Sequence, residues 1–265
     1  MGDKTLNDFV SQYFKQQQEV FGNIFYSEKD TSLSSIEKVL LLEGTKTEMG
    51  DYEEKKIIIS DLPTDLFTHE PDWKKTKSLD SLYEKIHNCQ NCPLGATRKN
   101  FVFGTGNPEA DIMLIGEAPG ADEDEQGKPF VGRAGQLLTK IIESIGLSRD
   151  DVFICNIIKC RPPENRAPFP SEIDECEPYL IKQIELIQPK FILALGLTAI
   201  DTLLKKKNKM AEIRGIVQNY HGIKMVVTYH PAALLRNPNW KKLVWDDVRQ
   251  LRRLYDEYLS SKLKI

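Results

Sequence analysis

Several features of membrane, secreted and nucleotide-binding proteins are missing from this 265-residue chain. No apolar run approaches the roughly 20 residues that span a bilayer, and the first residues lack the hydrophobic segment of a secretory signal. Neither a Gly-x-x-x-x-Gly-Lys-Ser/Thr loop nor a Gly-x-Gly-x-x-Gly loop opens a helix, so a phosphate cradle is not expected. We therefore expect a cytoplasmic protein with no membrane partner.

Arginine is absent from the first 75 residues, which hold 9 lysines and 15 acidic residues. The rest of the chain holds 27 basic and 24 acidic residues, so its net charge is +3. Because guanidinium groups are common phosphate ligands, any contact with nucleic acid is expected in this second part. The charge alone is equally compatible with an ordinary mixed surface.

The pattern of the chain changes at about residue 79. Residues 4–22 look helical, residues 44–78 are charged and contain two prolines, and neither stretch carries a chemical motif. We interpret residues 1–78 as an N-terminal extension and linker of unknown function. Residues 79–265 form the candidate functional domain.

Within that domain, apolar strand patterns alternate with helical ones. Strands are predicted at Ile112–Ile115, Val152–Ile158, Phe191–Leu195 and Met225–Thr228, and helices at Leu79–Ile86, 134–145, 171–187, 198–206 and 241–260. Such alternation is typical of parallel βαβ units. The sequence therefore predicts an α/β fold, a three-layer sandwich in which helices flank a mostly parallel sheet.

A polar loop follows the first predicted strand. Residues 116–124 combine carboxylates with glycines, and Phe130 adds an aromatic ring before the next helix. Ligands of open α/β sheets bind where strands end in such loops. The loop therefore predicts a pocket for a small polar ring.

Cysteine is scarce, with five residues in the chain. Cys89 and Cys92 share one turn, Cys160 and Cys176 lie in or beside a proline-rich loop, and Cys155 lies inside a strand pattern, where we expect packing. Disulfides are not expected in a reducing compartment. A four-thiolate set suits zinc or an iron–sulfur cluster. The residues alone leave that choice open, and four unrelated thiols remain the alternative.

The order of the motifs is more specific than any one of them. The series is Cys89-x-x-Cys92-Pro-Leu, Phe103-Gly-x-Gly-Asn-Pro, Gly116-Glu-Ala-Pro-Gly-x-x-Glu-Asp, Gly127-x-Pro-Phe-Val-Gly, Asn156-x-x-Lys-Cys-Arg-Pro-Pro-x-Asn-Arg, Cys176, Gly196-x-x-Ala, Arg214-Gly and His230-Pro-Ala. Over about residues 79–258, this series resembles the family-4 uracil-DNA glycosylases, the bacterial and archaeal type with an iron–sulfur cluster. Residues 1–78 fall outside the resemblance.

The resemblance implies a uracil-DNA glycosylase-like catalytic domain at 79–265. Such an enzyme is a DNA-repair hydrolase that flips uracil out of DNA and cleaves its N-glycosidic bond, leaving an abasic site. Its partner would be uracil-containing DNA, single- or double-stranded, and we expect a monomer. The resemblance also implies that four cysteines bind a structural [4Fe-4S] cluster rather than zinc: Cys89, Cys92, Cys160 and Cys176.

Three residues of the resemblance would recognise the base. Asn156 would accept a hydrogen bond from uracil N3–H and donate one to O4, the reverse of what cytosine requires. Phe130 would stack on the flipped base. His230 would donate to uracil O2, and this bond would strengthen as negative charge develops on the leaving base.

Further roles concern the thymine methyl, the water and the DNA. Glu123 would crowd uracil C5 and so exclude thymine, while Glu117 and Ala118 would position the attacking water. Lys159, Arg161, Arg166 and Arg214 are candidate phosphate contacts. Leu234, Leu235 and Arg236 would form a wedge that fills the space vacated by the base.

Two alternatives to a catalytically active glycosylase follow from the same resemblance. A DNA-binding or polymerase-associated module could keep the fold with little activity, but it would not need Asn156, Phe130 and His230 together. A covalent-trapping relative would carry an Arg-rich insertion that ends in histidine. Residues 144–151 contain no such insertion and no histidine, so we set this alternative aside.

Overall fold

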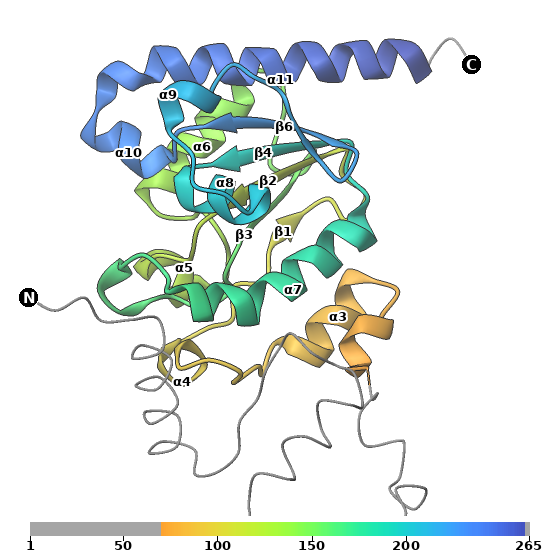
Figure 1. Cartoon of the computed structure of the whole chain (residues 1–265), viewed down its shortest axis with the longest axis vertical. Helices are drawn as coiled ribbons and strands as arrows, with labels where there is room; N and C mark the ends of the chain where they lie inside the picture. The colour runs from red at the N-terminus through yellow and green to blue at the C-terminus, as the bar shows by residue number, and fades with distance from the viewer. Residues whose placement is uncertain (1–69, 263–265) are drawn as a thin grey trace, which may run out of the picture. The chain divides into compact units, whose positions relative to one another are not determined.

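The computed structural model describes residues 70–262 (Figure 1). The predicted helix at 4–22 and most of the predicted linker at 44–78 lie outside these residues. Within them, the short 3₁₀ helix η3 (Asp72–Lys75) already belongs to the folded unit. Trp73 packs edge-on against the ring of Tyr179, with 4.9 Å between the ring centroids, and joins the buried core cluster there.

The centre of the fold is one six-stranded sheet in the order β1-β3-β2-β4-β6-β5. The strands are β1 (Thr105–Gly106), β2 (Ile112–Gly116), β3 (Phe153–Asn156), β4 (Phe191–Leu195), β5 (Gln218–Tyr220) and β6 (Ile223–Thr228). The four central strands run parallel, while β1 and β5 pair antiparallel at the two edges. Every residue of β2, β3 and β4 is buried, as expected where helices cover both faces of a sheet.

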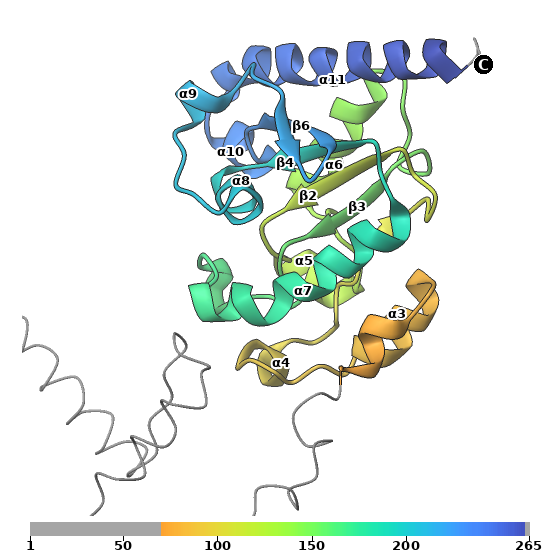
Figure 2. The same ribbon diagram turned by 45° about the vertical axis from the view of Figure 1, so that its right-hand side comes forward.

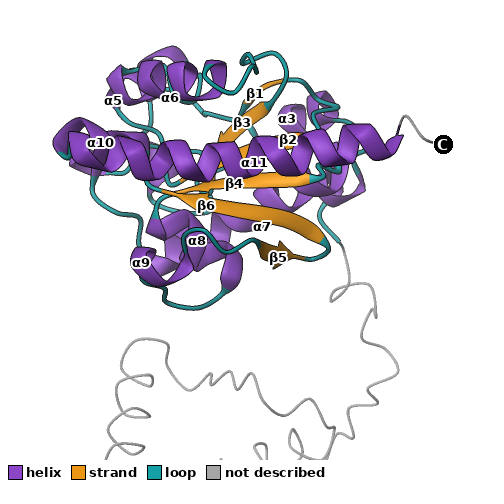
Figure 3. Cartoon of the chain, turned by 90° about the horizontal axis from the view of Figure 1, so that it is seen from above, coloured by secondary structure: helices purple, strands orange, loops and turns teal. Residues whose placement is uncertain are grey.

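Helices cover both faces of this sheet, which confirms the predicted three layers (Figures 2 and 3). The α-helices are α3 (Leu79–Ile86), α4 (Leu94–Thr97), α5 (Ala121–Gln126), α6 (Arg133–Glu143), α7 (Pro170–Ile187), α8 (Leu197–Leu204), α9 (Met210–Ile213), α10 (Pro231–Arg236) and α11 (Lys241–Lys262). One core cluster joins α3, α7 and α8 to the side chains of one sheet face. The other cluster joins α6, α10 and α11 to the opposite face.

Alternation along each strand assigns its side chains to the two cores. Met113 and Ile115 belong to the α7 side, whereas Ile112 and Leu114 belong to the α11 side. The predicted strands and long helices are therefore all present, with ends shifted by a few residues. Strand β3, for example, ends at Asn156 rather than Ile158, and the Ile157 N–H makes the last bond to β2, to the Gly116 carbonyl at 2.9 Å.

The acidic segment after β2 is helical in part, which corrects its prediction as a loop. Residues Ala121–Gln126 form α5, and the Glu123 side chain accepts from the Gly120 N–H at the start of the helix. Carboxylates in a first turn also interact favourably with the helix dipole. Gly127, with a φ of 68°, ends the helix. Among the described residues, no helix is long and apolar enough to cross a membrane.

Candidate active site

A pocket of about 410 Å³ opens at the carboxyl edge of the parallel strands. It contains all the residues that sequence analysis placed around the base: Glu117, Ala118, Glu123, Phe130, Asn156 and His230. They come from the ends of β2, β3 and β6, from helix α5 and from the segment between α5 and α6. The parallel order of the strands brings these distant segments together, since each strand ends at the same edge.

Asn156 is the buried polar group of this pocket. It is the last residue of β3 and 1% exposed. Its Oδ1 atom is the one buried side-chain N or O atom without a hydrogen-bond partner in residues 70–262. Because buried polar atoms are normally paired, this acceptor is available for the N–H group of a ligand.

Gly116, the last residue of β2, keeps the space in front of Asn156 open. A Cβ atom at this position would lie 2.5 Å from Asn156 Oδ1 and 2.5 Å from Phe130 Cζ. Any side chain would therefore fill the pocket between the amide and the aromatic ring. Sequence analysis placed Gly116 in a motif but gave it no function. Its position at the end of a predicted strand, where ligands bind, was the feature that could have indicated one.

The Phe130 ring forms an apolar wall of the pocket. Its centroid lies 5.4 Å from that of the His230 imidazole, and the two planes are tilted by 34°. The Phe130 backbone has a φ of 54°, which is uncommon for a residue with a side chain. Phe130 is 6% exposed. The residues packed around it therefore hold its backbone in this conformation.

His230 follows β6 and caps the start of α10. Its Nδ1 atom accepts a hydrogen bond from the Ala232 N–H at 3.2 Å. A neutral imidazole with Nδ1 as acceptor carries its hydrogen on Nε2, which is then available as a donor. Burial, together with the smaller effect of the charge of Arg236, lowers the pKa of His230 to about 4. At neutral pH this side chain is therefore an uncharged donor.

Glu123 is fixed by the backbone around it. Its carboxylate accepts from the N–H groups of Gly120 at 3.1 Å, Val131 at 2.9 Å and Gly132 at 2.9 Å. It therefore connects α5 to the segment that carries Phe130. Glu117 and Ala118 lie on the loop after β2 and line the same pocket.

The structure corrects two of the predicted DNA contacts. Lys159 is fully buried, and its ammonium donates to the Asn156 carbonyl at 2.8 Å and to Gln183 Oε1 at 2.6 Å. It cannot reach a phosphate, and it supports the backbone of Asn156 instead. Leu234 is 1% exposed and packs in the core cluster with α6, so it cannot insert into a duplex.

Arg214 is also engaged inside the protein, contrary to prediction. Its guanidinium donates twice to Asp247, with both distances 2.8 Å, and its side chain is 14% exposed. Thr228 donates to the same carboxylate at 2.6 Å. Thr228 is the last residue of β6 and lies two residues before His230. Arg214 therefore stabilises the end of this strand and is not free to bind a phosphate.

The remaining predicted contacts lie nearer to the pocket. Arg166 and Arg236 line it, although Arg166 also pairs with both oxygens of Glu172, at 2.8 and 2.6 Å. Arg161 donates to Asn165 Oδ1 at 2.8 Å. Leu235 is exposed beside Arg236 on α10. These four residues stay compatible with a surface that binds DNA.

Three of the four predicted ligand cysteines accept a hydrogen bond at sulfur. The donors are Tyr179 Oη to Cys89 at 3.3 Å, Arg98 Nη1 to Cys160 at 3.2 Å and the Lys159 N–H to Cys176 at 3.2 Å. Burial raises the pKa of Cys160 to about 11 and that of Cys176 to about 12, and neighbouring thiols contribute to both. Cys160 and Cys176 are buried, whereas Cys89 and Cys92 are half-buried.

No group of three or more His, Cys, Asp or Glu side chains in residues 70–262 is spaced to hold a single metal ion. A four-thiolate cluster places its ligands on different iron atoms, so it does not require that spacing. Donors to sulfur are typical of the groups that surround such clusters. Cys155 is fully buried inside β3, as expected for packing.

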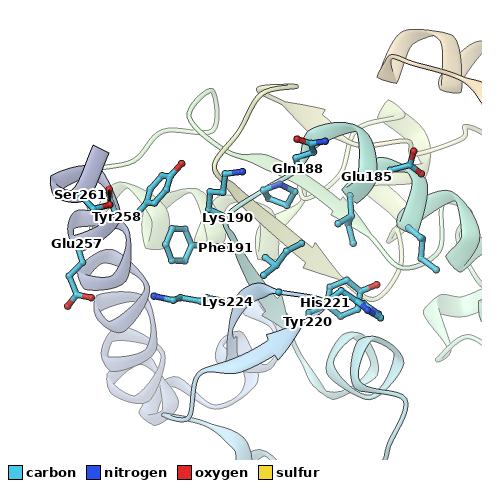
Figure 4. A pocket seen from close by; sticks show the side chains of 15 residues that line it. Glu185, Gln188, Lys190, Phe191, Tyr220, His221, Lys224, Glu257, Tyr258 and Ser261 are labelled. Atoms are coloured by element: carbon cyan, nitrogen blue, oxygen red, sulfur yellow. Dashed lines mark hydrogen bonds between the residues drawn. The ribbon is translucent and has the colours of Figure 1, made fainter. Parts of the chain in front are cut away.

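A hollow larger than this pocket lies elsewhere among residues 70–262. Its volume is about 950 Å³, and it is lined at the amino ends of β4 and β6 by Phe191, Ile223 and Lys224, with Tyr258 from α11 (Figure 4). It contains none of the residues predicted for the site. The smaller pocket around Asn156 is therefore the candidate active site.

The chain is similar to known proteins over most of its described residues. The sequence model of the Uracil DNA glycosylase superfamily matches residues 103–249. A type-4 uracil-DNA glycosylase of Saccharolobus solfataricus is 50% identical over 194 residues, which cover 70% of this chain and 88% of that protein. One from Thermotoga maritima is 41% identical over 184 residues, or 68% and 96% of the two chains. A DNA polymerase of Bacillus phage SP01 is 31% identical over 154 residues, which cover 58% of this chain but 17% of the polymerase.

Proposed function

The chain belongs to the type-4 enzymes of the uracil-DNA glycosylase superfamily, and we propose that the pocket around Asn156 is its uracil-binding site. It is a DNA-repair glycosylase that removes uracil from DNA by hydrolysis of the N-glycosidic bond. The reaction requires a flipped base, a water at C1′ and a place for negative charge on the leaving uracil. The pocket offers a residue for each of these needs.

The unpaired acceptor of Asn156 is the observation that carries the proposal. Uracil presents a donor at N3 and an acceptor at O4, which match the Oδ1 acceptor and the Nδ2 donor of one amide. Cytosine presents an unprotonated N3 beside a donor amino group, so both contacts would be repulsive. Leaving buried polar groups unpaired in this way is a strong basis for discrimination.

Phe130 and Gly116 would shape the space for the base. The ring supplies a flat apolar face, and the absence of a Cβ at Gly116 leaves room beside Asn156 Oδ1. Stacking of a base on an aromatic ring contributes about 1–3 kcal/mol. The base would therefore be held by its face on Phe130 and by its edge on Asn156.

His230 would stabilise the leaving group. Its Nε2–H donor is available because Nδ1 is already occupied by the Ala232 N–H. A hydrogen bond to uracil O2 strengthens as charge accumulates on the base, so it favours the transition state over the ground state. A neutral donor performs this function without a proton transfer, which suits the lowered pKa of His230.

The acidic loop would act on the water and on the thymine methyl. Glu117 and Ala118 line the pocket next to Asn156 and would position the attacking water. Glu123 would exclude a methyl group at C5. Because three backbone N–H groups hold its carboxylate, this side chain would act as a rigid wall rather than as a group that moves aside.

We further propose that Cys89, Cys92, Cys160 and Cys176 hold a [4Fe-4S] cluster. The residues fit this group because N–H and O–H donors point at three of the four sulfurs, and such donors stabilise thiolates. The cluster would join the turn before α4 to the segment that runs from β3 into α7. Its contribution would be structural, and the residues of the reaction lie in the pocket.

DNA would enter over the surface formed by Arg161, Arg166, Leu235 and Arg236. The guanidinium groups would contact phosphates, and the exposed Leu235 would replace Leu234 as the residue that fills the vacated base space. Single- and double-stranded DNA would both be substrates, and the domain would act as a monomer. The similarity to a phage DNA polymerase leaves a module without turnover as the alternative.

A uracil-containing oligonucleotide tests the proposal directly. The full chain should produce an alkali-labile site at uracil and none at thymine or cytosine. Asn156→Asp should lower this activity by several orders of magnitude because an acceptor would face uracil O4. Asn219→Asp in the edge strand β5 is the matched control, since its Oδ1 contact with the Gly222 N–H is retained. Equal cleavage by Asn156→Asp and the unchanged chain would contradict the site assignment.

A further inference from the structure

Phe130 has a left-handed backbone although it is not a glycine. Its φ of 54° lies in a region that is costly for a residue with a Cβ. Such conformations persist where the surrounding structure holds them in place, and they are concentrated at functional sites. The contacts of the Phe130 backbone therefore show what keeps its ring in the pocket.

Arg149 holds the carbonyl groups on one side of this segment. It lies in the turn between α6 and β3. Its Nη1 atom donates to the Phe130 carbonyl at 3.1 Å and to Thr139 Oγ1 at 3.3 Å, and its Nη2 atom donates to the Pro129 carbonyl at 2.9 Å. Burial lowers the pKa of Arg149, because removing the charged guanidinium from water is unfavourable. The three hydrogen bonds offset this loss of hydration.

Glu123 holds the amide groups of the next two residues, Val131 and Gly132. Helix α6 packs directly against the Phe130 backbone. The contact is so close that a Cβ on Gly135 would lie 1.9 Å from the Phe130 carbonyl oxygen. Three contacts therefore hold the segment. Arg149 binds its carbonyl groups, Glu123 binds its N–H groups, and helix α6 packs against its backbone. Glu123 belongs to the residues assigned to the site, whereas Arg149 does not.

We propose that Arg149 is a positioning residue for uracil recognition, which holds the Phe130 backbone so that the ring stands beside Gly116 and His230. This inference rests on the proposed function of the pocket. It requires the guanidinium fork, since one planar group reaches two successive carbonyls and a hydroxyl. A lysine at this position would keep the charge but could not reproduce the planar arrangement of donors.

A double-mutant cycle between Arg149 and Phe130 tests the proposal. We expect Phe130→Ala to lower kcat/KM on uracil-containing DNA by on the order of tenfold to a hundredfold, and Arg149→Gln to lower it by about tenfold. Because Arg149 acts through the ring, the double variant should cleave as fast as Phe130→Ala alone. Arg149→Lys provides a second variant for the cycle if Arg149→Gln unfolds.

Arg252→Gln is the matched control. Arg252 also donates to a backbone carbonyl, that of Ile145 at 3.2 Å, but it lies on α11 and does not contact the Phe130 segment. Its effect should multiply with that of Phe130→Ala. Independent effects of Arg149 and Phe130, or full activity of both Arg149 variants, would overturn the proposal. Absence of uracil release by the unchanged chain would instead contradict the function of the pocket.

Discussion

Gly116 and Asn156 are paired in register at the ends of two neighbouring strands, and the missing side chain of Gly116 leaves open the space beside the Asn156 amide. A Cβ on Gly116 would lie 2.5 Å from Asn156 Oδ1, and this oxygen has no hydrogen-bond partner within residues 70–262. Two neighbouring parallel strands end at these residues, which are paired in register. The empty space and the unpaired acceptor therefore arise from the same feature of the sheet.

Gly116→Ala should reduce the cleavage rate strongly while the protein stays folded. Packing an extra methyl group into this region should lower the free energy of unfolding by about 1–3 kcal/mol. Single-turnover cleavage should fall by on the order of 10²-fold, because small misplacements at a reacting centre have effects of this size. Thermal unfolding and single-turnover kinetics on one preparation measure both. An unchanged rate would show that the base binds elsewhere.

His230 allows a prediction about pH. Its folded pKa of about 4 lies below its ordinary value, so the unfolded chain binds a proton between about pH 6.5 and pH 4 that the folded chain does not. The contribution of His230 to the free energy of unfolding is constant above pH 6.5 and falls as the pH drops toward 4. Chemical denaturation from pH 7 to pH 4.5 should show a smaller loss for His230→Gln than for the unchanged chain.

The same residue should control the rate of the reaction. We expect His230→Ala to lower the single-turnover rate by on the order of 10²-fold or more, as the loss of an oxyanion donor does in other enzymes. The activity of the unchanged chain should not decline between pH 7 and pH 5 through protonation of His230, because its pKa is well below this range. A rate that follows a group of pKa 6.5 would contradict the neutral donor.

Cys176 and Cys155 form a matched pair for the cluster, since both are buried and only one is a proposed ligand. Cys176→Ala should lose iron and absorbance in the blue and should unfold at lower temperature, because metal binding is coupled to folding. Cys155→Ala should keep its iron. Metal analysis after anaerobic purification measures both variants. Stoichiometric zinc without iron in the unchanged chain would contradict the cluster.

The sequence was informative where one physical constraint dominates. Fully buried strands are continuous apolar runs, and for Phe191–Leu195 both predicted ends agree with the structure. The edge strands β1 and β5 were missed because they are two and three residues long and lack such runs. Helix α5 was missed because six polar or small residues show no apolar period.

The errors in the candidate site concern residues whose environment comes from distant segments. Lys159 follows a strand and resembles a surface cation, but it is buried because Gln183 on α7 supplies an acceptor. Arg214 likewise finds Asp247 on α11. Arg149 carries no motif, and its importance appears only with the backbone angle of Phe130. Sequence shows which groups are present, whereas their pairing depends on the fold.

The N-terminal extension provides the last prediction. Residues 1–69 hold 7 lysines, 13 acidic residues and no arginine, so their net charge cannot favour binding to phosphates. A chain that starts at Glu70 keeps Trp73 against Tyr179, whereas one that starts at Leu79 loses this contact. We expect the first to keep its iron and its stability and to bind DNA at low salt as tightly as the full chain or more tightly.

The second, shorter chain is the control for the folded boundary. Without Trp73 it should unfold at a lower temperature, because part of the core cluster beside Tyr179 becomes exposed. The difference in DNA affinity between the full chain and the chain from Glu70 should fade as salt is raised, since the repulsion is screened. Aggregation or loss of iron in the chain from Glu70 would show that the extension supports the catalytic domain.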